Sequence, residues 1–115
     1  MSIRGIVWYN SYLDNAKSQL EEIIFNYKIR QCYPVEIKNT KTNMEVKFEN
    51  GDYWNVRKAT DSSRGCRCNV AYIERSVDFN SYSQIVEPAI VDFPFSGVTL
   101  WGEGNLRITD EVKED

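Results

Sequence analysis

The pair Asn50-Gly51 limits the folds open to this chain, because it marks a tight turn between two segments of alternating polar and hydrophobic residues. Both residue types tolerate the positive φ angles that a two-residue type I′ hairpin turn requires. Hydrophobic residues alternate with polar ones on both sides of the pair, at Met44, Val46, Phe48, Trp54 and Val56. The sequence therefore predicts an antiparallel hairpin with one buried face and one polar face.

A basic loop and a short hydrophobic strand follow the hairpin. Loop 59–68 carries Arg64 and Arg67, and the apolar run 70–73 (Val-Ala-Tyr-Ile) is typical of an interior strand. This run ends at Glu74-Arg75. Two charged side chains are therefore expected at the carboxyl end of a strand, where open α/β sheets bind their ligands.

The rest of the chain supplies further strands and two helices. Ser11 and Asp14 resemble a capping box that starts a helix over 12–27, and Pro88 is expected to end a second helix over 81–87. Strands are predicted at 3–9, at 35–38 as an edge strand, and at 98–101 as an interior strand.

These patterns predict a single α/β domain with a mixed β-sheet, an antiparallel hairpin and two helices. We place the domain at residues 1–105 and an acidic C-terminal tail at 106–115.

Composition narrows the possible functions. The net charge of -3 disfavours general nucleic-acid binding but does not exclude a local basic patch. With no histidine and with Cys32, Cys66 and Cys68 as its three thiols, the chain excludes imidazole-based catalytic triads and disfavours a zinc site. Without long apolar runs or a signal peptide, we expect a cytoplasmic protein with reduced thiols, no membrane contact and no cofactor.

Three arginines close together in the sequence are the main candidates for ligand binding. Arg57, Arg64 and Arg67 should converge if the hairpin folds beside the loop, and guanidinium groups match phosphate oxygens in pairs. Alternatively, these arginines are solvated and pair with nearby acids, namely Glu49, Asp52 or Asp61.

Other side chains near this segment complete the predicted site. Tyr53 and Phe79 are the candidates for stacking on a base, whereas Trp54 is expected in the core. Asn69 either caps the loop or reads a base edge. Arg75 is included in the ligand set, although a structural ion pair between Glu74 and Arg75 is the simpler interpretation.

The order of these segments resembles the ATPase domain of phage large terminases, over about residues 6–102. In that family an N-G-S hairpin precedes an R-G loop, and the next strand is the Walker B strand, which ends in two acids. The matching segments are Asn50-Gly51-Asp52, Ser63-Arg64-Gly65, Ala71-Tyr72-Ile73-Glu74-Arg75, Ser83–Pro88 and Val98-Thr99-Leu100.

Two departures indicate that ATP hydrolysis is not retained. The chain has no G-x-x-x-x-G-K-[ST] segment, so the backbone and lysine that hold the phosphates are missing. Arg75 stands where the family has its second acid, which orients the attacking water. The resemblance therefore implies a remodelled relative with no enzymatic activity and no catalytic residues.

The size of the chain and its mix of aromatic and arginine residues are similar to another group, the small phage sponges that counter Thoeris defence. These proteins sequester cyclic ADP-ribose isomers. The resemblance implies a non-catalytic phage protein in the host cytoplasm that binds a phosphate-bearing, nucleotide-derived immune signal, either cyclic ADP-ribose or a cyclic oligonucleotide. The alternative is a terminase-like structural or regulatory protein that binds a phage or host protein without a small-molecule ligand.

Aromatic residues near the C-terminus favour a homo-oligomer. Phe93-Pro94-Phe95 and Trp101 add aromatic area that a small monomer would not cover fully.

Overall fold

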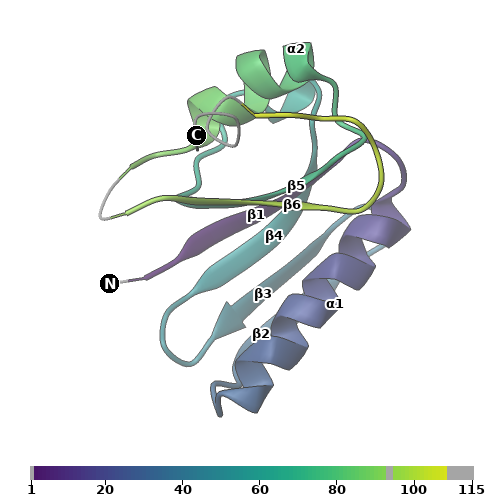
Figure 1. The fold of residues 1–115 in the computed structure, drawn as a ribbon. Helices are drawn as coiled ribbons and strands as arrows, with labels where there is room; N and C mark the ends of the chain where they lie inside the picture. The colour runs from purple at the N-terminus through teal and green to yellow at the C-terminus, as the bar shows by residue number, and fades with distance from the viewer. Residues whose placement is uncertain (1, 93–94, 109–115) are drawn as a thin grey trace.

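The computed structural model describes residues 2–92 and 95–108, which form a mixed sheet of six strands. In chain order the strands are β1 (Arg4–Tyr9), β2 (Pro34–Asn39), β3 (Met44–Phe48), β4 (Tyr53–Lys58), β5 (Val70–Glu74) and β6 (Gly97–Trp101). Their order across the sheet is β2-β3-β4-β1-β5-β6 (Figure 1). The predicted α/β class, with its mixed sheet and antiparallel hairpin, is confirmed.

The sheet combines a parallel half with an antiparallel half. β1 pairs in parallel with both β4 and β5, and β5 pairs in parallel with β6. β3 is antiparallel to β4 and to β2. The strand 98–101 was expected in the interior, but β6 lies at one edge of the sheet, so that prediction was wrong.

The turn of the hairpin differs from the predicted type I′. Gly51 has φ +95°, but Asn50 does not adopt a positive φ, which a type I′ turn would require. The amide of Phe48 donates to the carbonyl of Asp52 (2.9 Å), so the connection has three residues and ends in a left-handed glycine. Asn50 instead accepts a hydrogen bond from the Asp52 amide through its side chain (3.0 Å).

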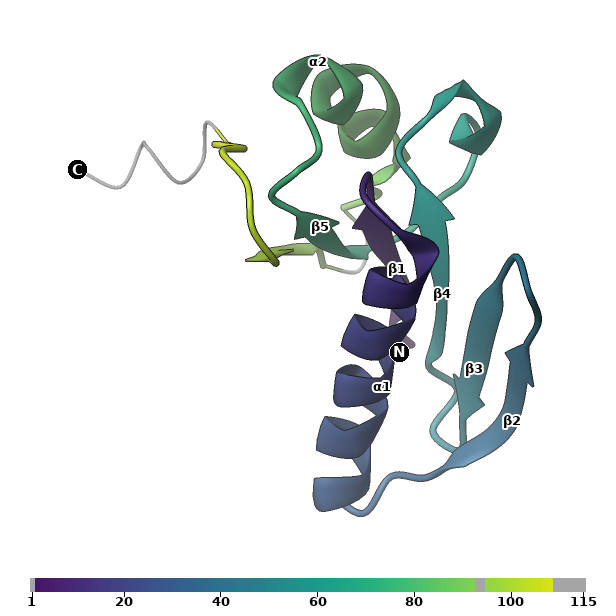
Figure 2. The same ribbon diagram turned by 90° about the vertical axis from the view of Figure 1, so that its right-hand side faces the viewer.

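Helix α1 (Leu13–Ile29) covers one face of the sheet (Figures 1 and 2). Its buried residues pack on side chains from β1, β3 and β4, and this first core includes Val7, Ala16, Leu20, Ile23, Ile24, Val46, Trp54 and Val56. The predicted capping box is absent: Tyr12 is the N-cap residue, and no side chain caps the helix. The hydroxyl of Ser11 donates to Glu74 instead.

Three short helical turns cover the other face. They are α2 (Phe79–Ser81), a π-helical turn (Tyr82–Val86) and a 3₁₀ turn (Glu87–Ala89). The helix predicted over 81–87 therefore starts earlier, and Pro88 does not end it. Pro88 lies in the first turn of the 3₁₀ helix, where no backbone donor is needed.

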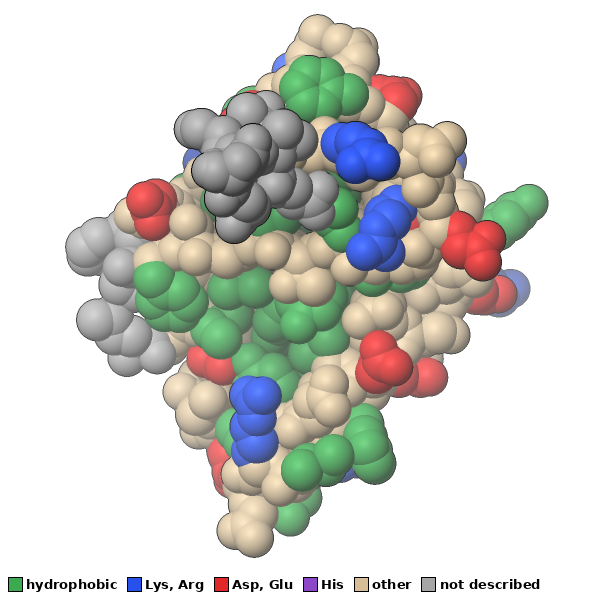
Figure 3. Space-filling view, viewed as in Figure 1, with side chains coloured by type: hydrophobic (Ala, Val, Ile, Leu, Met, Phe, Trp, Pro, Cys, Tyr) green, Lys and Arg blue, Asp and Glu red, His purple; other side chains and the backbone are tan. Residues whose placement is uncertain are grey.

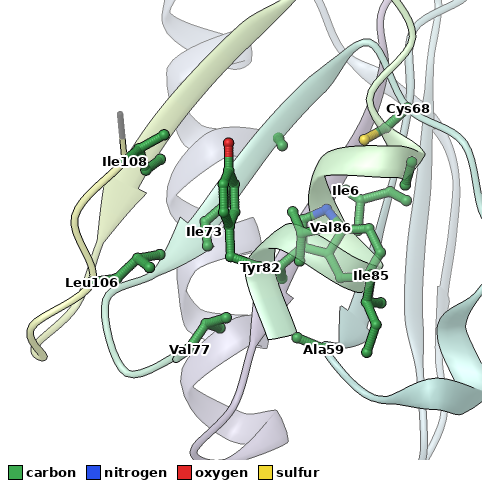
Figure 4. Packing of buried hydrophobic residues seen from close by; sticks show 13 residues of the cluster. Ile6, Ala59, Cys68, Ile73, Val77, Tyr82, Ile85, Val86, Leu106 and Ile108 are labelled. Atoms are coloured by element: carbon green, nitrogen blue, oxygen red, sulfur yellow. The ribbon is translucent and has the colours of Figure 1, made fainter. Parts of the chain in front are cut away.

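The second core lies beneath these turns (Figure 4). Its members come from β1, β5, the helical turns and the C-terminal segment, and they include Ile6, Ile73, Tyr82, Ile85, Val86, Leu106 and Ile108. Leu106 and Ile108 are buried, so packing continues past position 105. Trp101, expected to add uncovered aromatic area, is also buried. Of the other two expected aromatic residues, Phe95 is 42% exposed, whereas Phe93 lies with Pro94 and residues 109–115 outside the described residues.

Candidate ligand-binding site

The order of the strands reverses at β1. From β1 the chain passes through α1 and builds β2, β3 and β4 on one side, and then it crosses to β5 on the other side. In open α/β sheets, ligands bind outside the carboxyl ends of the strands at such a switch point. A ligand site is therefore expected where β1, β5 and β6 end.

Glu74, the last residue of β5, connects the carboxyl end of β5 to the segment that follows β1. Only 4% of the residue is exposed, and its carboxylate accepts hydrogen bonds from the amides of Asn10 (2.8 Å) and Ser11 (3.0 Å) and from the Ser11 hydroxyl (2.5 Å). Burial alone would raise the pKa of Glu74, but these hydrogen bonds outweigh it and hold the pKa below its usual value.

The expected ion pair between Glu74 and Arg75 is not formed. Among the described residues Glu74 has no cationic partner, and the guanidinium of Arg75 donates to the carbonyl of Gly102 (3.0 Å). Successive side chains along a strand point to opposite faces of the sheet, so Glu74 and Arg75 at the end of β5 point in different directions. This leaves Arg75 beside the turn that follows β6.

A first cavity of about 490 Å³ opens beside Glu74, and we call it the acidic cavity. Its wall comes from α1, the end of β5 and the turn after β6, and includes Ser11, Asn15, Glu22, Glu74, Trp101 and Glu103. It contains three carboxylates, whereas no lysine or arginine of the described chain lines it. The negative potential of this wall favours hydroxyl and amino donors and disfavours phosphate.

A second cavity of about 650 Å³ adjoins the first, and we call it the arginine cavity. Ser76 lines both cavities. The arginine cavity is lined by Arg75, Arg107 and Phe79. Among the described residues its wall has one acid, Asp78, which caps α2 by accepting from the amide of Ser81 (2.6 Å). In the space-filling view, which shows the same side of the molecule as Figure 1, basic side chains lie next to hydrophobic ones in the upper part (Figure 3).

Two of the predicted site residues therefore meet in one cavity. Phe79 is 54% exposed, so its ring is accessible for stacking, and Arg75 lies in the same wall. Sequence reasoning missed Arg107, because it assigned residues 106–115 to a tail. The alternation of Leu106 and Ile108 around Arg107 was the signal available, since it resembles an extended segment packed on a core.

The three other arginines of the predicted site, Arg57, Arg64 and Arg67, line neither of these cavities. Arg64 pairs with Asp61 (3.0 Å) and donates to the carbonyl of Gln84 (3.2 Å), as the alternative interpretation expected. Arg67 donates to the backbone carbonyl of Cys66 (3.0 Å). Arg57 is exposed on β4. No hydrogen bond within the described chain joins any two of them.

Asn69 has a structural role at the opposite end of the sheet. Its side chain accepts from the amide of Arg4 (2.9 Å) and donates to the carbonyl of Ser2 (3.4 Å). The residue is 5% exposed, which favours the predicted loop-cap role over base reading.

Tyr53 lies on the face of β4 that is turned away from α1. Its hydroxyl donates to Glu45 (2.9 Å), and the guanidinium of Arg4 is 6.0 Å from the ring centre. Burial and the Glu45 bond raise the pKa of Tyr53 to about 12. A hollow of about 420 Å³ beside it is lined by Arg4 and Lys47 as well. This hollow lies beside Arg4 and Tyr53, the first residues of β1 and β4, and so at the end of the sheet opposite the switch point.

Residues 2–92 and 95–108 contain no cluster of three or more His, Cys, Asp or Glu side chains placed to hold a metal ion. Within the same ranges, no helix combines the length and the hydrophobicity that a membrane crossing needs. All three cysteines are free thiols.

No family model, no curated protein and no solved structure matches this chain. The resemblances to terminases and to Thoeris sponges stay predictions.

Proposed function

We propose that the protein binds a phosphorylated, nucleotide-like ligand in the arginine cavity and does not alter it chemically. The observation that carries the proposal is the cavity wall itself, where Arg75 and Arg107 accompany the exposed ring of Phe79. Guanidinium groups bind phosphate oxygens through charge-assisted hydrogen bonds, and an exposed aromatic ring stacks on a base.

The acidic cavity next to this wall complements the rest of such a ligand. A nucleotide carries ribose hydroxyls and, in adenine, an amino group, all of which donate hydrogen bonds. Glu103 and Glu22 in the acidic cavity are acceptors for such groups. A ligand with phosphates in one cavity and its sugar in the other would use both signs of charge, whereas inorganic phosphate would use only one.

Binding without turnover is supported by what the site residues already do. Glu74 occupies the Walker B-like position, but its carboxylate is held by the Asn10 and Ser11 amides and the Ser11 hydroxyl. Histidine is absent from the whole chain. We therefore propose sequestration of a nucleotide-derived immune signal, a cyclic ADP-ribose or a cyclic oligonucleotide, as the biological role, in keeping with the resemblance to phage sponges.

Calorimetric titration tests the proposal with pyrophosphate, ADP, ADP-ribose, cyclic ADP-ribose and a cyclic dinucleotide as separate ligands. We expect at least one nucleotide to bind, and we expect Arg107→Ala and Arg75→Ala each to weaken that binding by about 10-fold or more, because each removes a charge-assisted contact. Arg30→Ala is the matched control, because Arg30 is exposed, follows α1 and lines neither cavity.

Two further readouts complete the experiment. Heat denaturation followed by mass spectrometry should recover the ligand intact, whereas recovery of a cleaved product would show turnover. Failure of every compound to bind at about 1 mM would reject the site. In that case the alternative role, binding to a phage or host protein, would become the better account.

A further inference from the structure

β6 forms one edge of the sheet, and its own five residues carry none of the sequence features that normally protect an edge. Its five residues, Gly-Val-Thr-Leu-Trp, include no charge and no proline. Val98 is 42% exposed, and Thr99 is exposed as well. Both ribbon views show β6 at a margin of the sheet (Figures 1 and 2). An exposed strand of this composition is a template for pairing with another strand.

The other edge strand, β2, is protected in three ways. It begins with Pro34, its register with β3 shifts between Pro34 and Glu36, and it carries Glu36 and Lys38. Proline, irregular pairing and charged side chains all discourage edge-to-edge association. The two edges therefore differ, and only β6 has the composition of a strand with neighbours on both sides.

Two residues of β6 have backbone amides and carbonyls that face away from β5, and we call these the outward groups. The amide of Gly97 donates to Asn69 (2.9 Å) and the carbonyl of Trp101 accepts from Arg75 (2.8 Å), so both face β5. Backbone groups alternate in direction along a strand, and the amides and carbonyls of Val98 and Leu100 therefore face away from β5. No residue in the described ranges bonds to these outward groups.

We propose that β6 pairs with β6 of a second copy of this chain, in an antiparallel arrangement centred on Thr99. This register pairs all five residues of the strand. It places Val98 opposite Leu100 of the partner subunit, so that the outward groups of the two strands satisfy one another in closely spaced hydrogen-bonded pairs. Two threonines meet at the centre, which is a favourable cross-strand pair. The result is one sheet that continues across a two-fold axis.

The same register brings the partner close to the proposed ligand site. Extended past the strand ends, it directs Phe95 of the partner subunit toward the turn Gly102–Gly104. That turn contributes to both cavities, through Gly102 to the acidic one and Gly104 to the arginine one. Phe95 is 42% exposed within one chain. The partner would thus add an aromatic side chain at the rim of the site.

Sedimentation velocity of the full chain tests the proposal. We expect a reversible dimer at roughly 100 µM, because a pair of short strands is a small interface. Val98→Pro removes only an outward amide, which an edge strand tolerates, and should give a monomer with an unchanged circular dichroism spectrum and melting temperature. Val98→Lys should do the same by placing like charges near the interface.

Ile37→Lys, on the exposed side of β2, is the matched control and should remain a dimer. A wild-type protein that is monomeric at all concentrations would overturn the proposal. So would a dimer that survives Val98→Pro, or one that is lost equally in Ile37→Lys. These outcomes are independent of whether a nucleotide binds, because no ligand is present in the measurement.

Discussion

Replacing Gly5 with alanine is expected to destabilise the protein by about 3 kcal/mol or more, as overpacking of a rigid core does. Gly5 lies in β1 directly beside Trp54 of β4. A Cβ atom on Gly5 would come within 2.4 Å of the Trp54 indole ring, which is buried and held by a hydrogen bond to Tyr27 (3.0 Å). The ring cannot move aside without breaking that bond. Urea unfolding followed by fluorescence measures the loss.

The matched control is Gly97→Ala. Gly97 begins β6, has an ordinary φ, and an added Cβ would meet nothing within 4 Å. Its stability should change by less than about 1 kcal/mol, with stabilisation as the favoured direction, since alanine restricts the unfolded chain. In a Trp54→Leu background the cost of Gly5→Ala should fall. If the cost stays the same in both backgrounds, the clash with the indole is not its cause.

Replacing Glu74 with alanine is the second large effect we expect, at about 3 kcal/mol. The change leaves the amides of Asn10 and Ser11 without their acceptor at the junction of β1 and α1. Thermal unfolding of wild type and Glu74→Ala at neutral pH measures this loss of stability. Glu22→Ala is the control, because Glu22 lines the same cavity but is exposed and receives only a long side-chain bond from Gln19 (3.3 Å). Equal losses in both variants would contradict the role given to Glu74.

The stabilisation by Glu74 should also depend on pH. The pKa of Glu74 is lower in the folded protein than its ordinary value, so the folded state favours the ionised carboxylate. This contribution is complete above the unfolded-state pKa of about 4.3 and is lost as the pH falls through the folded-state value. The difference in stability between wild type and Glu74→Gln should therefore shrink on acidification. A difference that stays constant from pH 7 to about pH 3 would show that the charge is not involved.

The sequence predicted the elements whose signal is local. The alternation around Asn50-Gly51 located the hairpin, and helix α1 and strand β5 follow from periodicity and from a short apolar run. The turn type was wrong, because Asn50 uses its side chain to bind the Asp52 amide instead of adopting positive φ.

The other differences between expectation and structure came from contacts that are distant in sequence. Ser11 looked like a helix cap, but Glu74, far along the chain, takes its hydroxyl. Arg57, Arg64 and Arg67 were grouped by proximity in sequence, whereas Arg75 and Arg107 are brought to one cavity by the return of the C-terminal segment. Residues that are close in sequence share a site only when the chain between them is short or turns back on itself. Here the loop after β4 leads Arg67 away from Arg57, toward the start of β5.

If the arginine cavity binds a nucleotide-like ligand, the chemical shifts of the backbone amides around that cavity should change when the ligand is added. Titration of ¹⁵N-labelled protein with the tightest nucleotide should shift the amides of residues 75–79 and 102–107, on both sides of the cavity. Amides in the loop 61–68 should stay in place. Shifts confined to that loop, or to Tyr53 and its neighbours, would rule out the arginine cavity as the binding site and restore the site first expected from the sequence.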